Sequence, residues 1–119
     1  MIYIFDDKKN RQEGYRWSNE KFKQYADFLT PVYHYSEVRE DDDRKKIFSE
    51  GNTILFHESF FDTDFNRHQK EAIKIRRELE ELAQTHPNFS LAFFSGSKSS
   101  RLLNNNIAYL PVSIMYQNL

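Results

Sequence analysis

The chain has 119 residues, the length of one domain, and its 17 basic and 18 acidic side chains leave a net charge of −1, which argues against unspecific binding to nucleic acid or to an anionic membrane. It contains no cysteine, which excludes a disulfide framework or a thiolate site, and no apolar run near the roughly 20 residues of a membrane helix. Because the first residues also lack the pattern of a signal peptide, we expect a single domain, residues 1–119, in the cytoplasm.

The first strand is expected at residues 2–5, a short apolar run that ends on two adjacent carboxylates, Asp6 and Asp7. Residues 8–15 are mostly polar and predict a loop. In open α/β sheets, ligands bind beyond the carboxyl ends of the strands, so this acidic pair lies where a cation or a phosphoryl group would be bound. The pair is also compatible with a solvated strand end.

A helix is expected next, because four apolar side chains recur at three- and four-residue spacing: Phe22, Tyr25, Phe28 and Leu29. Ser18 or Asn19 is suited to cap the start of this helix, and Pro31 is expected to end it. Residues 32–35 are rich in β formers and predict a short second strand.

The middle of the chain predicts a helix, a strand and a longer helix. Residues 40–48 place acidic before basic side chains, as the helix dipole favours, and predict a short solvated helix. Residues 53–56 form a continuous apolar run, typical of a central strand, which leads into His57 and Glu58. Over residues 65–83, a stripe of apolar side chains opposite a charged face predicts the longest helix: Ala72, Ile75, Leu79 and Leu82.

The last third of the chain predicts two more strands with little helix around them. Residues 89–94 form a strand that leads into Ser95, and residues 107–110 form a strand that Pro111 closes. Only about a dozen residues separate these strands, too few for a full crossover helix, so we expect the fourth helix to be short or missing. The fifth helix is at most a stub within residues 113–119.

Strands that alternate with helices at this spacing predict parallel βαβ units, and therefore an α/β fold with a doubly wound, five-stranded parallel sheet. We expect the flavodoxin-like strand order 2-1-3-4-5, in which ligands bind at the switch point between strands one and three. The polar residues that follow strands one, three and four would then share one rim of the sheet: Asp6, Asp7, His57, Glu58 and Ser95.

This pattern resembles the receiver domain of two-component response regulators, over nearly all 119 residues. Residues 2–7 (IYIFDD) resemble the first strand of the family with its magnesium-binding acidic pair. Residues 54–57 (ILFH) resemble the third strand, whose last position in the family is the phosphoryl-accepting aspartate. Residues 91–96 (LAFFSG) resemble the fourth strand and the hydroxyl residue after it. Residues 109–113 (YLPVS) resemble the fifth strand, where the family has a lysine before a proline.

The resemblance implies a receiver-like site from which two parts are missing. An aspartyl phosphate needs an aspartate nucleophile, a divalent ion and a cation opposite the phosphoryl oxygens. The acceptor position holds His57, or Glu58 if the register shifts by one, and the lysine position holds Leu110. Lys98, in the loop after Ser95, either reaches the rim or points into water. We therefore expect a degenerate receiver that keeps the scaffold and has lost the phosphorylation switch.

Two interpretations of the rim residues stay open. Asp6, Asp7 and Glu58 offer the oxygen ligands that Mg²⁺ prefers, so a magnesium site is possible although no cofactor is required. Otherwise the acidic pair caps loops and accepts backbone N–H groups. His57 is either a metal ligand or phosphoryl acceptor, or a hydrogen-bonded rim residue.

The edge beyond the fourth strand is expected to lack helical cover, whereas parallel sheets need both faces covered. We therefore expect apolar side chains there to stay partly exposed and to form an interface: Ile107, Tyr109, Ile114, Met115 and Tyr116. In receiver domains this face is the usual output and dimerisation surface. The resemblance thus implies a protein partner or a second copy of the chain at strands four and five, and neither nucleic acid nor a membrane.

Two functions of different classes follow from these observations. The first is a non-enzymatic, receiver-like signalling or interaction domain, acting as a homodimer or as a module of a larger regulatory protein. The alternative is a magnesium-dependent enzyme for phosphoryl transfer or phosphodiester cleavage, whose acidic cluster consists of Asp6, Asp7 and Glu58, with Asp62 as a further candidate.

Overall fold

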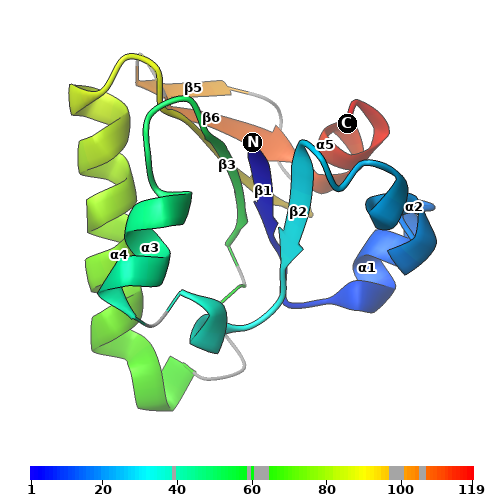
Figure 1. The fold of residues 1–119 in the computed structure, drawn as a ribbon, viewed down its shortest axis with the longest axis horizontal. Coiled ribbons are helices and arrows are strands. Elements are labelled where there is room, and N and C mark those ends of the chain that lie inside the picture. The colour runs from blue at the N-terminus through cyan, green and yellow to red at the C-terminus, as the bar shows by residue number, and fades with distance from the viewer. Residues whose placement is uncertain (39, 59, 61–64, 97–100, 105–106) are drawn as a thin grey trace.

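A six-stranded sheet forms the centre of the computed structural model (Figure 1). The structure describes residues 1–38, 40–58, 60, 65–96, 101–104 and 107–119, and of residues 35, 65–72 and 101–104 it describes the backbone only. The strands are β1 (Ile2–Phe5), β2 (Leu29–Val32), β3 (Thr53–His57), β4 (Ser90–Ser95), β5 (Arg101–Asn104) and β6 (Ile107–Pro111). The helices are α1 (Lys9–Gly14), α2 (Asn19–Gln24), α3 (Asp41–Ile47), α4 (Phe65–Thr85) and α5 (Val112–Gln117), with a 3₁₀ turn at Tyr35–Glu37.

The strand order β2-β1-β3-β4-β6-β5 confirms the predicted fold class. The first five strands of this order are parallel, and they correspond to the flavodoxin-like order 2-1-3-4-5. The sixth strand, β5, was not predicted. It pairs antiparallel with β6 at the edge of the sheet, in the place where the sequence suggested a short or missing helix.

Both faces of the sheet are covered, as a doubly wound fold requires. Figure 1 shows α3 and α4 on one side of the sheet and α1, α2 and α5 on the other. Consecutive strand residues alternate between the two cores, since Phe5 and Phe93 pack with α4, while Ile4 and Phe94 pack with α2 and α5. The first core is the larger of the two and is rich in phenylalanine.

The region before β2 differs from the prediction. Residues 8–15 were expected to form a loop but contain α1, and α2, capped by the Ser18 hydroxyl, ends at Gln24. Leu29 belongs to β2 and not to the helix, because β2 pairs with β1 in a register that starts at Ile2↔Leu29. The second strand therefore begins three residues earlier than expected and contains Pro31.

The middle of the chain agrees with the prediction more closely. Helix α3 lies within residues 40–48, and α4 spans the predicted stripe and two further residues. Ile75 and Leu79 are buried and Leu82 is half-buried, whereas the side chain of Ala72 is outside the described part. In the described residues, no helix is both long enough and apolar enough to cross a membrane.

The prediction that the apolar side chains at this edge stay partly exposed is wrong for four of the five residues. Ile107, Tyr109, Met115 and Tyr116 are buried within the chain itself, and only Ile114 is exposed, at 43%. The edge is less open than the sequence suggested, because β5 extends the sheet beyond β6. Although α5 has only six residues, it covers the second core with Val112, Met115 and Tyr116.

Arg44 is a buried charge in α3 that the sequence did not identify, with 7% of its surface exposed. Its guanidinium forms ion pairs with Asp41 and Glu78 and donates a hydrogen bond of 3.0 Å to the carbonyl oxygen of Val38. Arg44 thus ties α3 both to α4 and to the segment before it.

We expect Arg44→Met to lower the free energy of unfolding by about 1–3 kcal/mol, because it leaves the buried carbonyl of Val38 without a donor. The carboxylates of Asp41 and Glu78 are partly exposed and can be hydrated again. Urea unfolding measures the change. Lys46→Met, at an exposed position of the same helix, is the control and should change stability by no more than about 0.5 kcal/mol. Equal effects of the two variants would contradict this role of Arg44.

Candidate functional site

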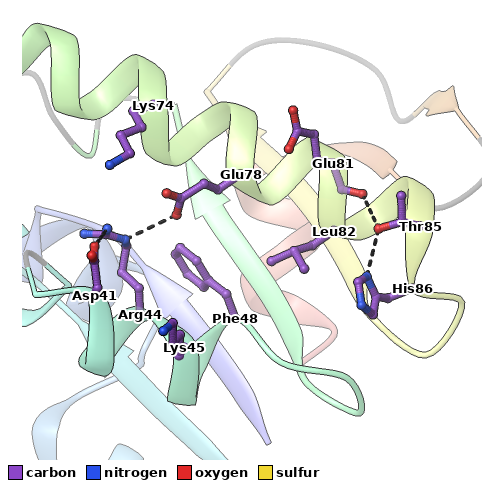
Figure 2. A pocket seen from close by; sticks show the side chains of 10 residues that line it. All are labelled: Asp41, Arg44, Lys45, Phe48, Lys74, Glu78, Glu81, Leu82, Thr85 and His86. Carbon is purple, nitrogen blue, oxygen red and sulfur yellow. Dashed lines mark hydrogen bonds and ion pairs between the residues drawn. The ribbon is translucent and has the colours of Figure 1, made fainter.

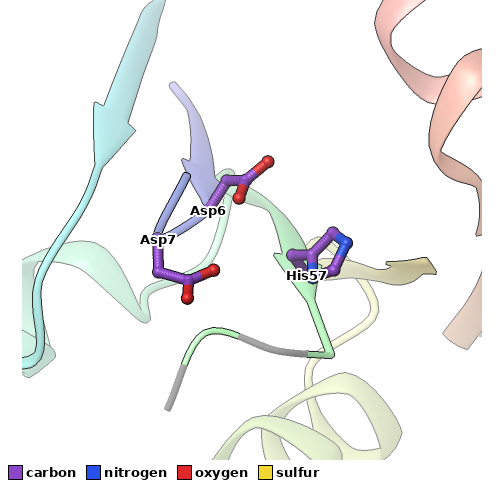
Figure 3. Close-up of side chains that lie close together, drawn as sticks. All are labelled: Asp6, Asp7 and His57. Atoms are coloured by element: carbon purple, nitrogen blue, oxygen red, sulfur yellow. The ribbon is translucent and has the colours of Figure 1, made fainter. Parts of the chain in front are cut away.

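Three polar side chains meet at the carboxyl ends of β1 and β3, and we call Asp6, Asp7 and His57 the rim cluster (Figure 3). One potential ligand atom from each residue lies within 4.8 Å of the others. The two strands are parallel neighbours, with Phe5 paired to Phe56, so the residues that follow these positions reach the same edge. The sequence predicted this convergence for Asp6, Asp7 and His57 correctly.

The carboxylate of Asp6 is completely buried and is bound by three donors from the chain itself. Its Oδ1 accepts hydrogen bonds from the backbone N–H of Lys8, at 3.0 Å, and from the guanidinium of Arg11, at 2.5 Å. Its Oδ2 accepts a hydrogen bond of 2.7 Å from the hydroxyl of Tyr116. Asp6 is therefore paired internally on both oxygens.

Arg11 also belongs to this site, and the sequence did not identify it. It lies in α1, and its guanidinium is 2.5 Å from Asp6 and 3.8 Å from Asp7. A loop was expected at these residues, so no position was assigned to this cation. Asp7 and Arg11 are four residues apart, and this spacing is the signal that could have indicated the pair.

The pKa values of Asp6 and Tyr116 follow from their burial and their contact. Burial raises the pKa of Asp6, and the hydrogen bonds from Tyr116 and Lys8 and the charge of Arg11 oppose that rise. Burial also raises the pKa of the Tyr116 hydroxyl, and the neighbouring charge of Asp6 raises it further. Tyr116 consequently keeps its proton and acts as a donor to Asp6.

Tyr116 connects the rim cluster to the elements that cover the second core. Its backbone oxygen accepts a hydrogen bond of 2.9 Å from the indole N–H of Trp17. Its ring stacks on Tyr15, with centroids 5.6 Å apart, and meets the edge of Phe94 at 5.8 Å. The rim, the loop between α1 and α2, and α5 are thus joined through one residue.

His57 is 5% exposed and packs edge to face against Phe94, with ring centroids 4.9 Å apart. Burial lowers the pKa of His57 to about 4, with a further lowering from the charge of Arg11 and a partial rise from Asp7. The imidazole is therefore neutral at pH 7.

The other predicted site residues are not members of the rim cluster. Glu58 is exposed, and its Oε2 accepts a hydrogen bond of 3.4 Å from the hydroxyl of Tyr109, which also bonds to Ser95. Leu110 is half-buried and contributes an apolar side chain to the second core. Lys98 and Asp62 are outside the described residues, so their places relative to the rim stay predictions.

The rim cluster is a poor match to Mg²⁺. That ion prefers six oxygen ligands, whereas the third member here is an imidazole, and the expected carboxylate of Glu58 is not among the three. Carboxylates with a neutral imidazole suit zinc or manganese better. Arg11 already provides a positive charge at the oxygen of Asp6 that a metal ion would use.

Comparison of the chain with protein-family models, with curated proteins and with solved structures gives no match.

We expect His57 to make the protein less stable as the pH falls from about 6.5 to about 4. In this window the unfolded chain takes up a proton on His57 that the folded chain does not, so the free energy of unfolding declines by up to roughly 3 kcal/mol. Asp6 contributes to stability with the opposite sign near the acidic end of this pH range. Its pKa is raised in the folded chain, so the folded state takes up this proton before the unfolded state does.

The measurement is urea unfolding of the wild type and of His57→Asn at several pH values, in buffer that contains a chelator. Subtracting the two curves removes the contributions of Asp6 and of all other groups. The wild type should lose more stability than the variant between pH 6.5 and pH 4. Parallel curves would show that His57 does not titrate differently in the two states.

Proposed function

We propose that this chain is a receiver-like protein-interaction domain that does not accept a phosphoryl group. The observation that carries the proposal is the internal pairing of Asp6, whose two carboxylate oxygens are bound by Arg11, Lys8 and Tyr116. In the domains that this chain resembles, the equivalent acidic pair binds a divalent ion. Here a guanidinium supplies the positive charge at that carboxylate.

The residues around Asp6 support the same proposal. Transfer of a phosphoryl group to a receiver needs a carboxylate nucleophile and a second cation near the phosphoryl oxygens. The end of β3 carries His57, a buried and neutral imidazole, and β6 carries the apolar Leu110 before Pro111. The rim is therefore suited to holding its own elements together.

The fold supports a receiver-like domain only in general terms, since many functions share this strand order. The proposal therefore depends on where the polar residues stand. Asp6 and Asp7 follow β1, His57 ends β3 and Ser95 ends β4, in the same order along the chain as in receiver domains. A domain with a fixed rim would act by binding, either to a partner protein or to a second copy, alone or as a module of a regulatory protein.

We expect the wild type to remain unmodified when incubated with acetyl phosphate and Mg²⁺, because β3 ends on His57 and no aspartate stands at the acceptor position. The triple variant Arg11→Ala, His57→Asp, Leu110→Lys restores the acidic pair, the acceptor and the lysine. Intact-mass spectrometry should then show one added phosphoryl group in the triple variant only.

The matched control for that experiment is the triple variant Arg11→Ala, His57→Asn, Leu110→Lys, which has no nucleophile at position 57. A phosphorylated wild type would contradict the loss of the switch. A folded triple variant that stays unmodified would contradict the receiver-like geometry of the rim. Circular dichroism establishes that each variant is folded.

A second candidate function is metal-dependent phosphoryl transfer or phosphodiester cleavage, and the specific observation that favours it is the rim cluster. Two carboxylates and a neutral imidazole are a usable ligand set once Asp6 is released. In the folded chain Arg11 competes with any ion for Asp6. Phosphatase or nuclease turnover by the wild type would favour this candidate over the first.

We expect Arg11→Ala to increase the affinity of the rim for Mn²⁺ by at least about tenfold, because a charge-assisted hydrogen bond of roughly 1.5–3 kcal/mol no longer opposes the ion. Calorimetric titration gives the dissociation constants. Arg77→Ala, an exposed arginine of α4, is the control, and adding Asp6→Asn should reverse the gain. Equal affinities of wild type and Arg11→Ala would show that Arg11 does not block the site.

A further inference from the structure

A groove of about 600 Å³ lies between α3 and α4, on the face of the sheet opposite α1, α2 and α5 (Figure 2). This volume is in the range of small-molecule sites, which span roughly 300–1,000 Å³. No member of the rim cluster lines the groove, so a ligand bound there would act separately from the function proposed above. We call this space the α3–α4 groove.

The floor of the α3–α4 groove is apolar. Figure 2 shows the side chains of Phe48 and Leu82 between the Arg44–Glu78 ion pair on one side and Thr85 with His86 on the other. Phe48 is buried in the first core and Leu82 packs against that core, so the core holds both side chains in place. A ring placed on this floor would remove apolar surface from water, which favours binding.

The charged side chains that line the groove balance one another. They are three cations and three carboxylates: Arg44, Lys45 and Lys74, and Asp41, Glu78 and Glu81. Arg44 forms ion pairs with both Asp41 and Glu78, and Figure 2 shows Lys74 beyond the Arg44–Glu78 pair as seen from the floor. Lys45 is exposed, so its ammonium group keeps its contact with water. A charged ligand on the floor would lose hydration and meet no net opposite charge, so the lining favours an uncharged ligand.

The end of the groove at His86 provides a hydrogen-bond acceptor. The hydroxyl of Thr85 donates a bond of 2.8 Å to the carbonyl oxygen of Glu81, one turn earlier in α4. A hydroxyl has only one hydrogen, so in its 2.8 Å bond with His86 the oxygen of Thr85 accepts and Nδ1 of the imidazole carries the proton. In the neutral ring, Nε2 is then an acceptor, and among the described residues none donates to it.

The backbone holds this acceptor beside the floor. The N–H of His86 donates a hydrogen bond of 2.9 Å to the carbonyl oxygen of Leu82, which continues the last turn of α4. The imidazole therefore stands one helical turn from the apolar side chain of Leu82. A ring on the floor and a polar group at His86 are within the reach of one small molecule.

We propose that the α3–α4 groove binds an uncharged small molecule, with an aromatic ring on Phe48 and Leu82 and a hydroxyl group that donates to Nε2 of His86. The ring matches the apolar floor, the lack of charge matches the balanced lining, and the hydroxyl matches the remaining acceptor. A phenol is the simplest molecule of this class. An extended peptide fits less well, because the Arg44–Glu78 pair crosses the space between the two helices.

The test compares three probes of similar shape on the wild type at pH 7.5, by calorimetric titration. 2-Naphthol has the ring and the donor, and we expect saturable, one-to-one binding. 2-Methoxynaphthalene has no donor and should bind about tenfold more weakly, because the imidazole acceptor is covered but unpaired. 2-Naphthoate should also bind at least about tenfold more weakly, because its charge is desolvated without compensation.

Variants assign the binding to the groove. His86→Leu removes the acceptor and keeps an apolar side chain, so 2-naphthol and 2-methoxynaphthalene should bind it equally well. The matched control is His34→Leu, the same change at an exposed histidine outside the groove, which should keep the preference for 2-naphthol. Leu82→Arg fills the floor and should abolish binding of both probes. Circular dichroism establishes that each variant is folded, and the comparison of probes on the wild type does not depend on any variant.

Chemical shifts of backbone amides locate the bound probe, and those of Phe48, Leu82 and His86 should change on addition of 2-naphthol. Four results would each overturn the proposal: 2-naphthoate that binds as tightly as 2-naphthol, an undiminished preference for 2-naphthol in folded His86→Leu, the absence of saturable binding, or shift changes confined to the exposed Tyr25 and Phe28.

Discussion

A buried carboxylate, that of Asp6, is the constraint on which much of this structure depends. An ionised group that is fully removed from water is stable only when it is paired and hydrogen-bonded. The donors come from three places in the chain: the N–H of Lys8, the guanidinium of Arg11 and the hydroxyl of Tyr116. To satisfy Asp6, α1 must begin directly after β1, and α5 must return from the far end of the sequence to the rim of β1. One side chain therefore positions two of the three helices on that face.

The same constraint decides what the rim offers to other molecules. At the ends of β1 and β3, a parallel sheet usually exposes polar groups to a ligand. In this chain the buried carboxylate of Asp6 holds α1 and α5, and the neighbouring Asp7 also lies 3.8 Å from Arg11. Burial in turn keeps the imidazole of His57 neutral. At this rim both carboxylate oxygens of Asp6 are thus occupied by contacts within the chain.

The sequence was a good guide where one local pattern decided the outcome. Continuous apolar runs marked β1, β3 and β4, and the long stripe marked α4. It was a poor guide where distant contacts decided: Leu29 fits a helical spacing with Phe22, yet pairing with β1 places it in a strand. The bond between Asp6 and Tyr116 joins residues 110 positions apart, and no local pattern predicts it. The side chains expected to be exposed at this edge are buried for a similar reason. Strand β5 pairs with β6, and the short sequence of β5 does not indicate this pairing.

Pro31 limits how copies of this chain can associate. The oxygens of Phe28 and Val32 accept hydrogen bonds from β1, so the alternate residues of β2, Leu29 and Pro31, turn their backbone groups away from the sheet. The N–H of Leu29 already donates a hydrogen bond of 2.9 Å to the oxygen of Tyr25, and proline has no N–H, so neither residue offers a donor at this open edge. Another strand cannot continue the sheet past this edge with a full ladder of hydrogen bonds. Growth of the sheet into a fibre is therefore disfavoured at β2, and association of copies at this edge has to depend on side-chain surfaces.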